Sequence, residues 1–267
     1  MANGRQSSWF VCLLAAGAVL LAVGAAAAGQ LQDILSRGQV RVGIALGGEP
    51  IGFRNDRGEP SGYDVDVARL LAEKLGTRLE IVEVTGANRI PMLQSGQIDV
   101  IIANITATLE RAKAIDFTMP YLRAGIKVLA QRSAGIKGIE DLNGRKVVVG
   151  RGGTGEQLVK RLAPRAVLVY VDSYAPDGIL LMRQGRADAA LEDNSLVDYT
   201  AKQFPDRLVA LPQLYTSDAI CFGVRKSDAD FLRWLDMFIS EYVRTGQYRD
   251  TYRKWWGTDP AEIQPRW

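Results

Sequence analysis

Two stretches of the chain repeat one pattern of hydrophobic and polar residues. In residues 92–104 and 181–193 an apolar helix end is followed by Gly96 or Gly185, a short apolar run and a polar stretch that includes Asn104 or Asp193. Glycine adopts the left-handed conformation that ends many helices, and a short apolar run suits a strand covered on both faces. Ligands bind at the carboxyl ends of strands in open α/β sheets. The repeat therefore predicts two similar lobes that hold a molecule between them.

The rest of the pattern predicts alternating strands and helices. In the first half, the predicted strands are 40–44, 79–84 and 99–102, and the predicted helices are 64–75 and 88–94. In the second half, the predicted strands are 146–149, 168–171, 187–191 and 208–211, and the predicted helices are 156–162, 177–183 and 195–202. A strand at 219–224 and helices at 229–245 and 247–256 follow. The β-α-β order predicts parallel sheets covered on both faces.

The N-terminal segment, residues 1–28, has the layout of a secretory signal peptide. It carries one charge, Arg5, then an apolar run and an alanine-rich end that suits cleavage near Ala28. The alternative is a retained membrane anchor. Cys12 would leave with the signal, so the exported chain would hold one cysteine, Cys221, and no internal disulfide.

Composition excludes several classes of function. Without residues 1–28 the chain keeps 32 basic and 30 acidic residues, because only Arg5 of the 33 basic residues is removed. This balance gives no reason to expect nucleic acid or an anionic membrane as a partner. The sequence contains no histidine, which excludes a Ser-His-Asp or Cys-His mechanism and argues against a zinc or copper site. We expect no metal and no cofactor.

The residues after the first repeat predict a receptor for a carboxylate. Asn104 and Thr106 are two positions apart, so they point the same way in an extended segment, and Arg111 follows at the start of a predicted helical turn. Arginine meets a planar anion with two parallel hydrogen bonds. The alternatives for Arg111 are an ion pair with Glu110 or a solvated surface position.

The second repeat predicts the opposite charge. Asp193 could accept hydrogen bonds from a ligand ammonium, or it could cap the helix that follows it. Thr154 lies in a glycine-rich loop before a helix and could donate to an anion beside free N–H groups. The loop lacks the Gly-Lys-Ser/Thr ending of a nucleotide P-loop, so we do not expect a nucleotide.

Several ordered motifs give the chain a strong resemblance to one family, the bacterial extracellular solute-binding proteins of family 3, which serve ABC transporters for polar amino acids. The matching stretches cover nearly all of the predicted mature chain: Gly62 to Ala68, Asn88 to Asp99, Thr106 to Arg111, Asp116 to Tyr121, Asp141 to Gly144, Gly185 to Asp188 and Trp255 to Gly257.

The resemblance implies a two-lobed periplasmic-binding-protein type II fold. Each lobe of this α/β fold is a mostly parallel sheet flanked by helices, and two hinge crossings, near Ala124 and near Tyr215, join the lobes. It places residues 29–124 and 215–267 in lobe 1 and residues 125–214 in lobe 2. The lobes are expected to close on the ligand by hinge motion.

The resemblance also implies roles for single residues. Arg111 grips the α-carboxylate of an amino acid, with Thr106 and the loop residues Gly153 and Thr154 beside it, and Asp193 pairs with the α-ammonium. The residue at position 104 is usually small or hydroxylated in this family, so the contact of an asparagine there is less firmly implied.

The side chain of the ligand is less well specified. The family often places an aromatic residue over the ligand, and here that role would fall to Phe53 or to none. Arg89, in the sequence Asn-Arg-Ile-Pro, resembles the branch that binds glutamate and aspartate, where this arginine meets the side-chain carboxylate. The alternative for Arg89 is an ordinary surface position. Glu49 would repel an acidic ligand if it pointed inward.

The leading hypothesis is a periplasmic receptor that delivers a polar amino acid, acidic by preference, to the permease of an ABC transporter. The partners would be the free amino acid and the inner-membrane permease, with no nucleic acid, and the protein would be a monomer and not an enzyme. The alternative is an enzyme on the same scaffold that resembles cyclohexadienyl dehydratases. That reaction needs an acid in the cleft, such as Glu49 or Glu192, and we expect Glu192 to face away from Asp193.

Overall fold

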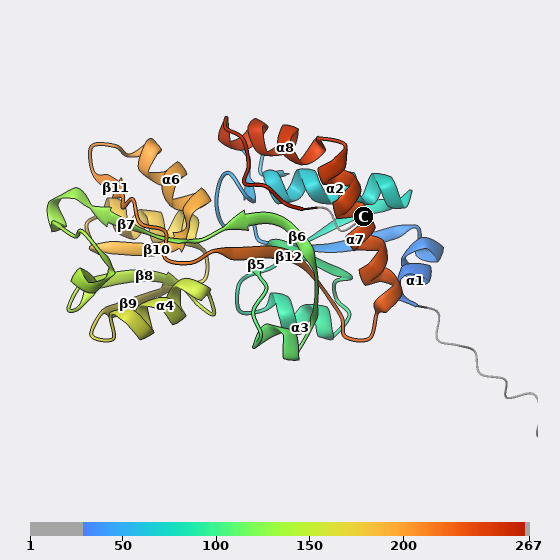
Figure 1. Cartoon of the computed structure of the whole chain (residues 1–267), viewed down its shortest axis with the longest axis horizontal. Coiled ribbons are helices and arrows are strands. Elements are labelled where there is room, and N and C mark those ends of the chain that lie inside the picture. The colour runs from blue at the N-terminus through green and yellow to red at the C-terminus, as the bar shows by residue number, and fades with distance from the viewer. Residues whose placement is uncertain (1–28, 265–267) are drawn as a thin grey trace, which may run out of the picture.

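The computed structural model describes residues 29–264, which form two lobes around two separate five-stranded sheets (Figure 1). The sheet of lobe 1 has the strand order β4-β1-β5-β12-β6, and the sheet of lobe 2 has the order β11-β7-β10-β8-β9. The predicted α/β fold of two lobes is confirmed. The predicted signal peptide, its cleavage site and the alternative of a membrane anchor lie outside the described residues.

In the sheet of lobe 1, β12 alone runs opposite to the other four strands. Strands β1, β4 and β5 are parallel, and β12 lies antiparallel between β5 and β6. The bounds are β1 (Gln39–Ile44), β4 (Arg78–Glu83), β5 (Val100–Thr106), β6 (Asp116–Ala124) and β12 (Asp218–Val224), with a small hairpin of β2 (Phe53–Arg54) and β3 (Pro60–Ser61).

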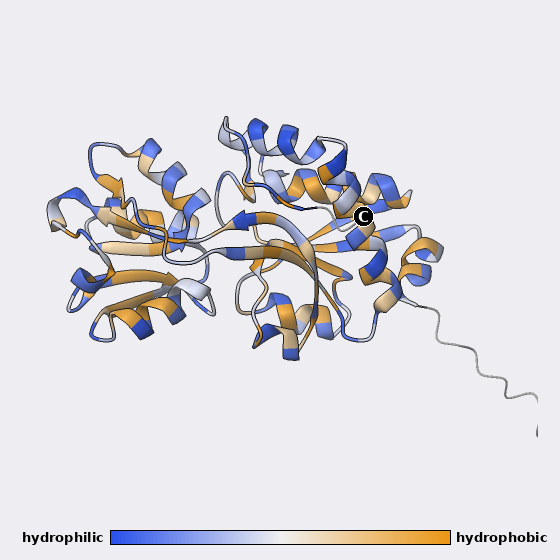
Figure 2. Cartoon of the chain, viewed as in Figure 1, coloured by the Kyte–Doolittle hydropathy of each residue, from blue (hydrophilic) through white to orange (hydrophobic). Residues whose placement is uncertain are grey.

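Both faces of β5 are buried, as its continuous apolar sequence requires. Val100 and Ile102 pack into one hydrophobic cluster, whereas Ile101 and Ile105 pack into another on the opposite face. Figure 2 shows the hydrophobic residues along the strands of both lobes. Helices cover these faces: α1 (Gln30–Arg37), α2 (Tyr63–Leu75), α3 (Arg89–Gln94), α7 (Ala229–Arg244) and α8 (Gln247–Trp256), with a 3₁₀ turn η1 (Arg111–Lys113).

Lobe 2 is built from one continuous part of the chain. Strands β8, β9 and β10 are parallel, and β7 pairs antiparallel with β10 and β11. The strands are β7 (Ile126–Gln131), β8 (Lys146–Gly150), β9 (Val167–Val171), β10 (Ala189–Asp193) and β11 (Leu208–Ala210). The helices are α4 (Thr154–Leu162), α5 (Ile179–Arg183) and α6 (Asn194–Gln203), with short helical turns η2 (Arg132–Ala134), η3 (Ile139–Leu142) and η4 (Tyr174–Gly178).

The chain crosses between the lobes twice, from β6 into β7 and from β11 into β12, and the two crossings run side by side (Figure 1). They are hydrogen bonded to each other, because the N–H of Tyr215 donates to the carbonyl of Ile126 at 2.9 Å and the N–H of Ile126 donates to Thr216 Oγ1 at 2.8 Å. We keep the division into residues 29–124 plus 215–267 and residues 125–214 as a proposal. Within residues 29–264, no helix combines the length and the hydrophobicity needed to cross a membrane.

Candidate functional site

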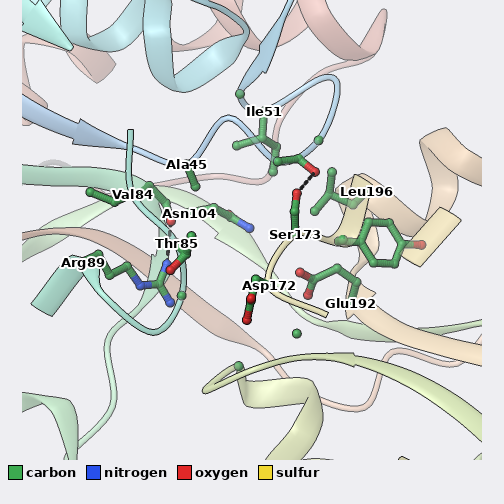
Figure 3. A pocket seen from close by; sticks show the side chains of 18 of the residues that line it. Ala45, Ile51, Val84, Thr85, Arg89, Asn104, Asp172, Ser173, Glu192 and Leu196 are labelled. Atoms are coloured by element: carbon green, nitrogen blue, oxygen red, sulfur yellow. Dashed lines mark hydrogen bonds between the residues drawn. The ribbon is translucent and has the colours of Figure 1, made fainter. Parts of the chain in front are cut away.

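A pocket of about 150 Å³ lies at the carboxyl ends of three parallel strands from each sheet, and Figure 3 shows side chains that line it. From lobe 1 it is lined by residues at or after the ends of β1, β4 and β5, and from lobe 2 by residues at or after the ends of β8, β9 and β10. This is the position at which open α/β sheets bind ligands. Its size suits a small molecule.

Asn104 and Asp193, the polar residues of the two repeats, meet across this pocket. Asn104 has a left-handed backbone with φ of 45°, and its Nδ2 donates to Asp193 Oδ2 at 2.6 Å. The other two side-chain oxygens, Asn104 Oδ1 and Asp193 Oδ1, are buried and have no hydrogen-bond partner among the described residues. Buried acceptors without a donor are costly. The pair therefore offers two acceptors to a ligand.

The left-handed turn at Asn104 is supported from inside lobe 1 by Asp64. Asp64 is fully buried, and its two oxygens accept the N–H of Asn104 at 3.0 Å and the hydroxyl of Tyr121 at 2.6 Å. Burial raises the pKa of Asp64 to about 7, although these two hydrogen bonds act in the opposite direction. Asp64 thus positions Asn104 without lining the pocket.

Asp193 stands at the N-terminus of α6, yet its side chain makes no capping hydrogen bond. The carboxylate instead faces Asn104 and the pocket, and only 3% of Asp193 is exposed. Burial raises the pKa of this carboxyl, and the hydrogen bond from Asn104 lowers it. The geometry favours a ligand contact over a cap.

Arg111 bridges the two lobes. Its Nη1 donates to the carbonyl of Thr106 at 2.7 Å, and its Nη2 donates to the carbonyl of Gly152 at 2.9 Å. Glu110, the alternative partner, is paired with Lys113 instead. Burial lowers the pKa of Arg111, and Asp193 acts against that shift. Arg111 is therefore a partly desolvated cation that lines the pocket.

The other expected neighbours of a carboxylate are also at the pocket. Thr106 is 5% exposed and lines it from β5. Gly153 and Thr154 line it from the start of α4, where Gly153 is the cap residue and Thr154 the first helical residue. The first N–H groups of a helix favour an anion. The structure brings Thr106, Arg111, Gly153 and Thr154 to one pocket.

Arg89 is not the surface arginine of the alternative interpretation. It is only 7% exposed, lines the pocket from α3 and donates from Nη1 to the carbonyl of Ala103 at 2.7 Å. Its buried Nε has no hydrogen-bond partner among the described residues. Burial lowers the pKa of Arg89 to about 10, so the side chain remains a cation at neutral pH.

Phe53 does not line the pocket, contrary to the expectation of an aromatic lid. It lies in the β2–β3 hairpin, where its ring meets Trp255 edge to face at a centroid distance of 5.8 Å. Glu49 also lies outside the pocket, in a separate hollow that Tyr199 lines. Gly47 and Gly48 of the same loop, in contrast, line the pocket.

The expectation that Glu192 faces away from Asp193 is wrong. Both side chains line the pocket, and Figure 3 shows the carboxylate of Glu192 pointing into it. Neighbouring residues of a strand do point to opposite faces, but the pocket lies at the end of β10, so both faces border it. Burial and the charge of Asp193 raise the pKa of Glu192. The sequence does carry a signal for this position, because the second repeat ends in two polar residues, Glu192 and Asp193, and not in one.

Direct contacts hold the two lobes together at the rim. The N–H of Ala175 and the hydroxyl of Ser173 both donate to the carbonyl of Gly47, at 2.7 and 3.1 Å. Trp256 Nε1 donates to the carbonyl of Ser195 at 3.4 Å. The sequence pattern did not single out Ser173, although it follows a predicted strand as Asn104 does. These hydrogen bonds link the two lobes directly.

Known proteins are similar to this chain in sequence. A model of the bacterial extracellular solute-binding proteins, family 3, matches residues 40–258. The glutamine-binding protein GlnH of a Bacillus subtilis ABC transporter is 30% identical over 238 residues, which cover 87% of this chain and 86% of that protein. The cyclohexadienyl dehydratase of Pseudomonas aeruginosa is 27% identical over 234 residues, which cover 85% of each protein.

A solved structure is similar to this chain in both fold and sequence. It is that of an ancestral amino acid-binding protein, described as a precursor of cyclohexadienyl dehydratase, with a TM-score of 0.81 and 34% identity. The match covers 85% of this chain and all of that one. The chain therefore belongs to the bacterial extracellular solute-binding proteins of family 3.

Proposed function

We propose that this protein is a periplasmic receptor that binds one free amino acid with a polar side chain between its lobes. It would deliver this amino acid to the inner-membrane permease of an ABC transporter and would act as a monomer. The B. subtilis relative is named as an ABC transporter protein that binds glutamine, which supports this class of function.

One observation carries the proposal: the pocket holds unsatisfied acceptors and cationic donors at the same time. Asn104 Oδ1 and Asp193 Oδ1 are buried acceptors without a hydrogen-bond donor among the described residues, and the α-ammonium of an amino acid can donate to both. Arg111, beside Thr106 and the start of α4, supplies donors to an α-carboxylate. A zwitterion satisfies both groups at once, whereas a simple anion or a simple cation satisfies one.

The direct test is ligand binding by protein freed of any bound molecule through unfolding and refolding. Thermal unfolding and calorimetry with the common amino acids should identify a ligand. At 100 times its dissociation constant, that ligand should add about 2.7 kcal/mol to the free energy of unfolding. Mass spectrometry of small molecules that co-purify from the export compartment would name the natural ligand. A correctly folded protein that gives neither heat nor stabilisation with any amino acid would end the proposal.

A second candidate is an enzyme of the cyclohexadienyl dehydratase type, and the position of Glu192 favours it. A general acid must sit in the cleft to protonate the hydroxyl group that leaves, and Glu192 lines the pocket with a raised pKa. Incubation with prephenate or arogenate tests it, because loss of water and carbon dioxide gives phenylpyruvate or phenylalanine. No aromatic product from a protein that binds amino acids would exclude the enzyme.

A further inference from the structure

The charged side chains that line the pocket fall into two groups. Two acidic residues that line it are already in ion pairs: Glu83 with Arg54 at 2.6 Å, and Asp172 with Arg151, which also lines the pocket, at 3.3 Å. Four others line the pocket but belong to no ion pair within residues 29–264, namely Arg89, Arg111, Glu192 and Asp193. The pocket therefore offers two cations and two anions to its ligand.

A bound amino acid uses one charge of each sign through its backbone. The α-carboxylate takes one guanidinium and the α-ammonium takes one carboxylate, as proposed above. One cation and one anion then remain for the side chain of the ligand. If Arg111 and Asp193 hold the backbone, the remaining pair is Arg89 and Glu192, which approach the pocket from α3 and β10 (Figure 3).

The remaining pair also has spare hydrogen-bonding capacity. Arg89 Nε is a buried donor without a partner among the described residues. Glu192 Oε2 accepts the N–H of Asp193 at 3.2 Å, which leaves most of the carboxylate available. A ligand side chain that only accepts hydrogen bonds, such as a carboxylate, would place a negative charge against Glu192. A side chain that only donates, such as an ammonium or guanidinium, would place a positive charge against Arg89.

From this balance we infer that the receptor selects an amino acid with a carboxamide side chain, glutamine or asparagine. The carbonyl oxygen of the amide accepts from Arg89, and its NH₂ group donates to Glu192. Donor and acceptor sit on separate atoms of an amide, so they can reach groups on different elements. This inference rests on the proposed receptor function, and it replaces the acidic preference that the sequence around Arg89 suggests.

The test measures dissociation constants of the refolded protein for glutamine, asparagine, glutamate, aspartate and arginine near pH 9, above the raised pKa of Glu192, so that its side chain is an ionised carboxylate. An amide should bind at least about tenfold more tightly than its acidic counterpart, because a second carboxylate meets Glu192. In Glu192→Gln the advantage of the amide over the acid should shrink by about tenfold or more. Glu140→Gln makes the same charge change in lobe 2 at an exposed residue that does not line the pocket, so it should leave both constants unchanged.

If Glu192→Gln fails to fold, the wild-type protein still gives an answer through pH. Protonation of Glu192 removes the repulsion, so glutamate should bind more tightly as the pH falls through the raised pKa of Glu192, while glutamine should change less. The charged or titratable groups that face Glu192 are Asp193 on β10, Arg89 on α3, Arg111 in η1, Tyr174 in η4 and Lys127, its register partner on β7.

The outcomes separate the two proposals. A preference for the amide that Glu192→Gln reduces supports the inference. Binding of an acidic or cationic amino acid as tightly as the amide overturns the inference and leaves the receptor function in place. A folded protein that binds no amino acid overturns the receptor function, and the inference falls with it.

Discussion

Asp64 makes the stability of lobe 1 depend on pH. Its buried carboxyl has a pKa of about 7, against 3.8 for an exposed aspartate. Between these values the native state holds a proton that the unfolded state has released. The free energy of unfolding therefore falls as the pH rises through this window and levels off above it. A shift of roughly 3 pKa units corresponds to about 4 kcal/mol, which is a large part of the stability of a typical domain.

The variant Asp64→Asn removes this titration while keeping the size of the side chain. Urea unfolding of ligand-free protein, followed at a series of pH values by tryptophan fluorescence, measures the effect. Trp234, Trp255 and Trp256, the tryptophans within residues 29–264, lie on α7 and α8 and therefore report on lobe 1. The wild-type protein should lose about 1.4 kcal/mol per pH unit relative to the variant up to about pH 7, and little more beyond it.

Tyr121→Phe provides a matched control, because it removes only the hydroxyl that donates to Asp64. That hydrogen bond lowers the pKa of Asp64, so the loss of stability should extend to higher pH in this variant. Parallel stability curves for the wild-type protein and Asp64→Asn would refute the reasoning. They would mean that Asp64 stays ionised in the native state.

Three further predictions concern the pocket and its closure. Arg111→Ala should weaken ligand binding by about 2 to 3 kcal/mol, or roughly 30- to 150-fold, because charge-assisted hydrogen bonds are lost; an unchanged calorimetric affinity would contradict its role. Asp193→Asn should weaken binding less, since the amide oxygen still accepts a hydrogen bond, and equal losses in both variants would count against the assigned ammonium contact. In Gly47→Ala the new Cβ would lie 2.4 Å from Ser173 Oγ. The binding free energy should weaken by about 1 to 3 kcal/mol, because the clash impairs closure of the lobes. Binding should recover in the double variant with Ser173→Ala; failure to recover would contradict a clash with Ser173 as the cause.

The elements that the sequence predicts well have clean periodicity and a marked end. The helix predicted at 64–75 is α2, which ends where Gly76 has a φ of 66° and donates to Ala72 and Glu73. Strand β6 is not predicted, because Pro120 and several polar residues interrupt its alternation. The register between β6 and β12 shifts beside Pro120, and an irregularity of this kind accommodates proline in a sheet.

Site residues were predictable where they end a strand or start a helix. Asp193 ends β10, Thr154 begins α4 and Arg111 begins η1, and all three line the pocket for that reason. Asn104 also lines the pocket, but β5 continues past it to Thr106. The orientation of Glu192 is predicted wrongly because the alternation of side chains applies to the two faces of a strand and does not describe a pocket at the end of the strand. Asparagine tolerates the positive φ found at Asn104, but the hydrogen bond from its N–H to the buried carboxyl of Asp64, 40 residues earlier, has no local signal in the sequence.

The path of the chain through the first sheet has a consequence for the order of folding. Strand β12 lies between β5 and β6 but begins at Asp218, more than 90 residues after β6 ends at Ala124. Lobe 1 therefore cannot complete its sheet until almost the whole chain has been made, whereas lobe 2 consists of consecutive residues. Contacts between residues distant in sequence form slowly. During synthesis, the inserted lobe should fold first, and the lobe that contains the N-terminus should fold last.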